Sequence, residues 1–246
     1  MTITIATWNI AGARPIKSAG LFDYGAEDVS YFSEQLHELD ADIVCLQETH
    51  LNNERSVAKV LAENLGYALH EVETSPSHID KAYSLGNAVF YRSEQEVTVK
   101  DFVFPYPSFP LSRQDGVPTV HIDKGFQLAQ FDFAAVVNLQ MQPLKFLGTP
   151  YDSENGMQFA KEMEAVLLRE IDRPTILCGD FNFAKPELLY LRALSGKVNA
   201  LPNVPTRPEG KRTDFIFIPS ETEIADSGVI ATNSDHFLCW ARLEIA

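Results

Sequence analysis

The chain has 246 residues, which is enough to bury a large core in one domain or two. Hydrophobic residues make up 45% and charged residues 22%, the balance of an ordinary globular protein. The net charge of −14 argues against tight binding of long duplex DNA, because such binding depends on basic side chains that neutralise many phosphates. No apolar run approaches the ~20 residues of a membrane span. The N-terminal residues also lack the features of a signal peptide, and the three cysteines lie in apolar runs, so we expect a cytoplasmic protein.

The first third of the chain alternates between strand and helix patterns. Residues 4–10 and 43–46 are apolar runs typical of strands. Between them, residues 27–39 carry apolar side chains at helical spacing, and a second helix over 57–65 is expected to end at Gly66. A helix between two such strands favours a parallel crossover. Asn9 and Glu48 would then lie together at the carboxyl ends of neighbouring strands, where ligands gather in α/β sheets.

The rest of the chain predicts mostly strands, with a helix over residues 154–171 and a shorter helix after Pro186 that ends at Gly196. A polar loop over residues 205–212 holds the main basic cluster. The expected strands cover residues 67–72, 87–91, 97–104, 126–133, 134–141, 176–182, 213–218, 228–231 and 237–245. No repeat or linker-like segment interrupts them, so the chain is predicted to form a single domain over residues 1–246.

The most informative strand covers residues 176–182, because its apolar start runs into Gly179, Asp180, Phe181 and Asn182. Alternation along a strand would point Asp180 and Asn182 to one side and Phe181 to the other. A carboxylate and an amide beyond a strand end would suit a metal-bound phosphate. Turn chemistry is the ordinary alternative, since Gly, Asp and Asn dominate turns. Gly179 would let the backbone approach another group closely.

Other predicted strands also begin or end in polar residues. Each of these residues alone could be an ordinary turn or edge residue. Seven of them from five segments are hard to explain as independent accidents. They are Asn9, Glu48, Asp180, Asn182, Asp214, Asp235 and His236.

Five short blocks that contain these residues resemble the signature blocks of the endonuclease/exonuclease/phosphatase superfamily, in the family's order. The blocks are residues 7–12, 46–48, 179–182, 213–217 and 234–236. The resemblance implies a four-layer α/β sandwich, in which two mixed sheets pack face to face with helices outside.

The resemblance also implies roles for single residues. Glu48 would be the principal Mg²⁺ ligand, with Asn9 and Asp235 nearby and Mn²⁺ as a substitute, a sparse set that suits Mg²⁺. Asp180 would orient or deprotonate the attacking water, and Asn182 would hold a phosphoryl oxygen. His236 would contact the scissile phosphate, and Asp214 would fix its tautomer.

Gln140 departs from the family pattern, because many members carry a histidine at the corresponding place. Glutamine could bind substrate through a hydrogen bond, but it cannot deliver a proton to the leaving group. Another group, such as Tyr106 or Tyr151, could supply that proton.

The sequence therefore predicts a Mg²⁺-dependent phosphoester hydrolase that prefers phosphodiesters. One alternative is a phosphomonoesterase for inositol phosphates or other small phosphoesters. Another is a non-catalytic module that binds phosphate or a partner, since fold alone does not decide function. Short or single-stranded nucleic acid is a candidate substrate, and the oligomeric state stays open.

Overall fold

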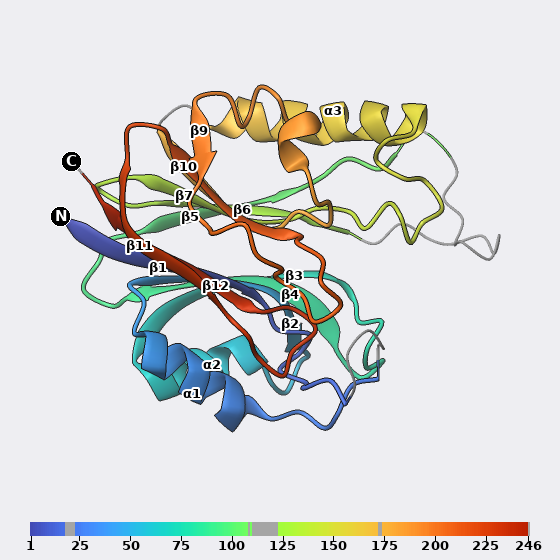
Figure 1. Cartoon of the computed structure of the whole chain (residues 1–246). Coiled ribbons are helices and arrows are strands. Elements are labelled where there is room, and N and C mark those ends of the chain that lie inside the picture. Colours follow the sequence, from blue (N-terminus) through green and yellow to red (C-terminus); the bar gives the residue numbers. More distant parts are fainter. Residues whose placement is uncertain (18–22, 108, 110–122, 172–173, 246) are drawn as a thin grey trace.

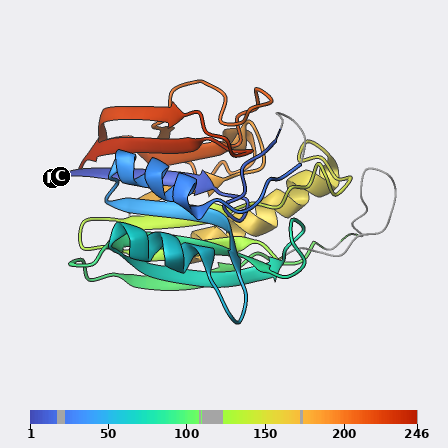
Figure 2. The same ribbon diagram turned by 90° about the horizontal axis from the view of Figure 1, so that it is seen from below.

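The computed structural model describes residues 1–17, 23–107, 109, 123–171 and 174–245. In this part of the chain, two six-stranded mixed sheets pack face to face, with helices on their outer faces (Figures 1 and 2). This is the four-layer α/β sandwich that the family resemblance implies. Both termini lie at the same end of the molecule (Figure 1).

The first sheet has the order β11-β12-β1-β2-β4-β3. Its strands are β1 (Thr2–Asn9), β2 (Ile43–Leu51), β3 (Tyr67–Pro76), β4 (Ser84–Arg92), β11 (Glu223–Ile230) and β12 (Leu238–Glu244). The second sheet has the order β5-β6-β7-β8-β10-β9. Its strands are β5 (Thr98–Val103), β6 (Gly125–Gln130), β7 (Ala135–Gln140), β8 (Thr175–Asp180), β9 (Lys197–Asn199) and β10 (Asp214–Pro219). Each sheet has one parallel pair, β1 with β2 and β7 with β8.

Three apolar clusters separate the four layers. Between the sheets, side chains such as Ile5, Cys45 and Ile176 from central strands are buried together. The outer face of the first sheet packs on α1 (Val29–Leu39) and α2 (Val57–Leu65). The outer face of the second sheet packs on α3 (Glu154–Glu170). The central strands are thus covered on both faces, which explains their continuous apolar sequences.

Each α-helix begins at a side chain that accepts a backbone N–H, as expected from the preference of Asp and Ser for such positions. Asp28 caps α1, Ser56 caps α2 and Ser153 caps α3. Gly66 follows α2 in the left-handed conformation with a φ of 73°, so the predicted end of that helix is correct. None of the helices in the described ranges is both long and apolar enough to cross a membrane.

The predicted helix after Pro186 is wrong. The structure has only a 3-10 turn, η1 (Pro186–Leu188), followed by further turns. Leu189 and Leu194 pack on the core, but Leu188 and Leu191 are 61% and 66% exposed, so the four leucines do not form one buried helix face. Strand β9 was not predicted, because three residues are too few to carry a period-2 pattern.

Candidate active site

Asn9 and Glu48 come close together because β1 and β2 run parallel, and β1 ends beside the middle of β2, which continues to Leu51. Asn9 is the last residue of β1 and pairs with Gln47 of β2. Glu48 follows at a β-bulge, with a φ of 54°. A bulge at this point re-aims the side chain, and Gly12 N–H fixes the Glu48 carbonyl at 2.7 Å. The predicted adjacency of Asn9 and Glu48 in neighbouring strands is therefore confirmed. The predicted place of Glu48 at the end of its strand is wrong, because pairing with β4 continues past the bulge to Leu51.

The second sheet contributes the facing carboxylates. Asp180 ends β8 and lies directly opposite Asp214, the first residue of antiparallel β10. Gln140 ends β7 and pairs with Asp180. Asn9 Nδ2 donates to Asp180 Oδ2 at 3.3 Å, so side chains from the two sheets touch across the site.

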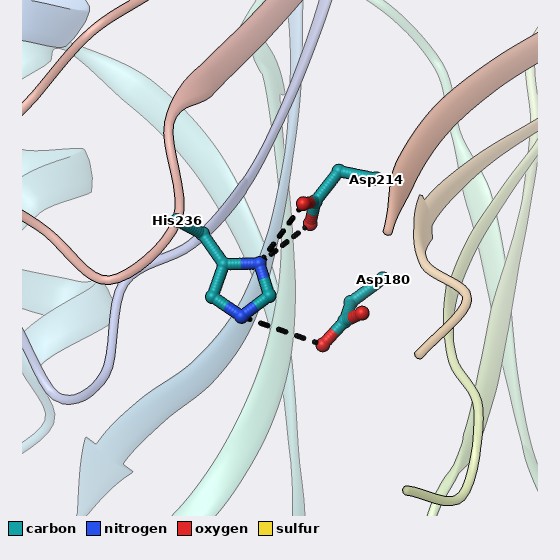
Figure 3. A group of neighbouring side chains, drawn as sticks. All are labelled: Asp180, Asp214 and His236. Carbon is teal, nitrogen blue, oxygen red and sulfur yellow. Dashed lines mark hydrogen bonds and ion pairs between the residues drawn. The ribbon is translucent and has the colours of Figure 1, made fainter. Parts of the chain in front are cut away.

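His236, just before β12, directs one ring nitrogen toward Asp214 and the other toward Asp180 (Figure 3). Its Nδ1 donates to both carboxylate oxygens of Asp214, at 2.9 and 3.0 Å, and its Nε2 lies 3.8 Å from Asp180 Oδ2. Thr206 and Thr213 hydroxyls donate to Asp214 Oδ2 at 2.6 and 3.1 Å. Asp214 is thus held in one orientation and, through Nδ1, orients the imidazole with Nε2 toward Asp180.

Burial and mutual charge set the protonation of this group. Burial alone would lower the pKa of His236, but the Asp214 carboxylate outweighs it and raises the pKa to about 9. Burial raises the pKa of Asp180 to about 6, although the charge on His236 opposes the rise. At neutral pH the imidazolium is therefore the stable form, and Asp180 is a carboxylate whose pKa suits a general base.

The His236 pKa can be measured by NMR titration of the metal-free protein. We expect a pKa of about 9, and in Asp214→Asn a fall toward or below the ordinary 6.5, because burial then acts without the Asp214 counter-charge.

The raised pKa of His236 also makes the stability of the fold depend on pH. Because the pKa is raised on folding, the stabilisation by protonated His236 is fully present below pH 6.5 and is lost as pH rises through about 9. Chemical denaturation of the wild type across this range should show that loss. An unchanged pKa in Asp214→Asn would contradict the assignment.

Glu48 lies in a second buried cluster. Lys124 Nζ lies 3.2 Å from Glu48 Oε1, and Gln140 Nε2 donates to the same oxygen at 2.7 Å. Burial would raise the pKa of Glu48, but the Lys124 ammonium and more distant positive groups lower it far below its usual range. Glu48 is consequently an anion despite being only 9% exposed.

Asp235 has its own neighbours. Tyr24 donates its hydroxyl to Asp235 Oδ2 at 3.1 Å, and Arg207 Nη2 lies 3.7 Å from the same oxygen. Burial raises the pKa of Tyr24, and the charges of Asp235 and Glu48 raise it further, so both carboxylates lie near this phenol. Arg207 belongs to the basic loop noted in the sequence, yet it is only 7% exposed and pairs with Asp235 and Glu209.

Asn182 lies beyond the strand, because β8 ends at Asp180. With a φ of 51°, its N–H donates to Asp180 Oδ1 at 2.8 Å and its Nδ2 donates to the Met141 carbonyl at 2.8 Å. The predicted strand was thus two residues too long, and a turn rather than strand alternation places Asn182. Phe181 faces the other way, as expected, and is buried against Phe215 and Phe217.

The donor set fits a hard divalent cation. Glu48 and Asp235 supply carboxylate oxygens. Among the described residues no donor contacts Glu48 Oε2, so this oxygen could bind the ion. The side-chain oxygen of Asn9, Oδ1, accepts from Ala11 N–H at 3.2 Å, which leaves its second lone pair for an ion. Ligand atoms of Asp180, Asp214 and His236 also lie within 4.8 Å of one another, but hydrogen bonds between His236 and Asp214 already use both Asp214 oxygens.

Sequence reasoning missed Lys124, Tyr24 and Arg207. Tyr24 and Lys124 stand outside any strand-end motif, so no local pattern marks them. Arg207 could have been found as the arginine of a polar loop that precedes the Asp214 strand. Of the suggested proton donors, Tyr151 donates its hydroxyl to the Gln142 carbonyl, and Tyr106 is 64% exposed.

Solved structures with the same fold cover nearly the whole chain. An endonuclease/exonuclease/phosphatase from Beutenbergia cavernae has a TM-score of 0.72 and 18% identity, over 100% of this chain and 72% of that chain. ANGEL2, a 2′,3′-cyclic phosphatase in complex with adenosine-2′,3′-vanadate, has a TM-score of 0.69 and 14% identity, over 100% and 96%. The mannosyl-6-phosphatase Bt3783 of Bacteroides thetaiotaomicron has a TM-score of 0.61 and 19% identity, over 99% and 100%. A comparison with curated proteins found no significant match.

A model of the endonuclease/exonuclease/phosphatase family matches residues 6–236, which include every strand-end residue described above. This match covers most of the chain, whereas the identities to solved structures support only the fold. The chain therefore belongs to the endonuclease/exonuclease/phosphatase family, whose members are phosphoester hydrolases.

Proposed function

We propose that this protein hydrolyses phosphodiesters in a reaction that requires Mg²⁺ or Mn²⁺. The observation that carries the proposal is the buried His236–Asp214 pair beside Asp180, which accepts from Asn9 and pairs in the sheet with Gln140, the donor to Glu48. A binding module would not need a histidine that one aspartate orients toward a second aspartate in this way. Short or single-stranded nucleic acids and small soluble phosphodiesters are the substrate classes that suit the acidic chain.

In this proposal each residue has a defined task. Asp180 accepts a proton from the attacking water, and protonated His236 donates from Nε2 to a phosphoryl oxygen. Asn182 uses its remaining amide hydrogen on another phosphoryl oxygen. Glu48, Asp235 and Asn9 hold the divalent cation. When bound there, the cation would polarise the phosphoryl group and stabilise the charge that develops on it.

Gln140 can contribute to substrate binding only in a limited way. Its Oε1 accepts from Lys124 at 2.7 Å, and one Nε2 hydrogen goes to Glu48. The second Nε2 hydrogen is the one that could reach a substrate oxygen. Gln140 is 1% exposed, so it would act at the floor of the site.

Diesters are favoured over monoesters by the balance of charge. A monoester near neutral pH carries up to two negative charges, whereas a diester carries one. In the described residues, the Lys124 and Arg207 cations are already paired with Glu48, Asp235 and Glu209. The similar fold of the B. thetaiotaomicron mannosyl-6-phosphatase keeps phosphomonoesters as the second candidate class.

The test is a matched substrate screen with added Mg²⁺ or Mn²⁺. Bis(4-nitrophenyl) phosphate, a 2′,3′-cyclic nucleotide and a short single-stranded oligonucleotide would be compared with 4-nitrophenyl phosphate, a sugar 6-phosphate and an inositol phosphate. We expect faster turnover of diesters, loss of turnover in EDTA, and a loss of orders of magnitude in Glu48→Gln.

Glu63→Gln on the exposed side of α2 is the control for the same change of charge. Faster turnover of monoesters would overturn the diester preference. Silence on all substrates with metal binding intact would instead indicate a binding module.

A further inference from the structure

Lys124 is an uncommon kind of residue for its position. It directly precedes β6, and its side chain is 3% exposed. Lysine is almost never fully buried without a partner, because an ammonium ion loses much of its hydration there. The Lys124 carbonyl accepts from Phe104 N–H at 2.9 Å, which fixes the backbone at the end of the β5–β6 ladder. A cation is therefore built into this edge of the sandwich.

Its partners form a closed triangle. Lys124 Nζ donates to Gln140 Oε1 at 2.7 Å and lies 3.2 Å from Glu48 Oε1. Gln140 Nε2 donates to that same Glu48 oxygen at 2.7 Å. An amide can accept from an ammonium and donate to a carboxylate at once, whereas a protonated histidine has no acceptor atom. Glutamine at position 140 is thus chemically matched to Lys124.

The triangle balances the Glu48 charge before any metal arrives. Both donors contact Oε1, so the charge and the orientation of the carboxylate are set by protein groups. A divalent cation bound through Oε2 would then lie within a few ångströms of the Lys124 charge and be repelled by it.

We propose that Lys124, held by Gln140, is a built-in counter-cation of Glu48 that positions this carboxylate and weakens its affinity for divalent metal. This inference rests on the proposed function, because it takes Glu48 as a metal ligand. It predicts the direction in which the affinity for divalent metal changes when Lys124 is replaced. If Lys124 had only a structural role, removing it would leave metal affinity unchanged or lower it. In our proposal, removing it raises the affinity.

The test is the Kd of Mn²⁺, measured by calorimetry at pH 8 on the full chain. In Lys124→Met we expect binding at least ~10-fold tighter than in the wild type, because one buried positive charge is removed beside a divalent ion. The metal-free variant should also have a lower Tm, since the buried Glu48 carboxylate loses its partner, and should gain more Tm from Mn²⁺ than the wild type. Lys124→Gln, which keeps a hydrogen-bond donor, is a second variant with the same expected direction should Lys124→Met not fold.

Two control variants separate the effect of the buried Lys124 charge from the effect of net charge. Lys161→Met on the exposed face of α3 changes the net charge equally and should leave the Kd unchanged. Lys124→Arg keeps the charge and should keep the weaker affinity. Unchanged or weaker binding in folded Lys124→Gln would overturn the inference while the proposed function stands. Wild-type affinity that does not respond to Glu48→Gln would overturn both the metal assignment and this inference.

Discussion

Asp180→Asn is expected to lower kcat for a phosphodiester by ~10²–10⁴-fold, which is the usual contribution of a general base. Asp180 is 1% exposed, lies 3.8 Å from His236 and accepts hydrogen bonds from Asn9 and Asn182. Asparagine keeps the size of the side chain but cannot accept the proton of the attacking water. Steady-state kinetics with saturating Mg²⁺ or Mn²⁺ measure the effect.

The control is Asp132→Asn, at an exposed position between β6 and β7, which should retain wild-type kcat. Unfolding curves of both variants should show that Asp180→Asn is folded. A folded Asp180→Asn variant with wild-type kcat would remove Asp180 from the proposed chemistry.

Gly179→Ala is expected to have the largest effect on stability, a loss of more than ~4 kcal/mol or failure to fold. Gly179 has a φ of 141°, and a Cβ added there would lie 1.9 Å from the carbonyl oxygen of Leu139. Leu139 is its partner in the parallel β7–β8 pair, so the clash is with backbone and no side-chain rotation relieves it. Urea unfolding followed by circular dichroism measures the change in free energy.

Gly196→Ala is the matched control, because Gly196 has a φ of 68° and an added Cβ would meet nothing within 4 Å. Strain from the positive φ alone should cost ~1 kcal/mol there. Equal losses at the two positions would mean that β7 and β8 separate easily, contrary to the expectation.

The sequence predicted most of the fold because its signals are local. Continuous apolar runs predict strands covered on both faces, and these became the central strands of both sheets. Gly66 correctly predicted the C-terminal end of α2. The helix predicted from the leucines after Pro186 does not form: Leu189 and Leu194 pack on the core from a series of turns, while Leu188 and Leu191 are exposed.

For the candidate site too, some residues could be predicted from the sequence and others only from the structure. Polar residues at predicted strand ends, in an order that resembles the family's motifs, were sufficient to single out the candidate site residues, which are Asn9, Glu48, Asp180, Asn182, Asp214, Asp235 and His236. By itself the sequence thus determined a four-layer family fold and a set of polar strand ends. Only the tertiary structure decided that Lys124 is the counter-charge of Glu48 and Gln140 its hydrogen-bond donor, and that Arg207 is buried against Asp235 rather than part of a surface patch. The physical reason is that an ion pair forms between groups that are close in space. Residues distant in sequence become such neighbours only when the two sheets and their loops pack together.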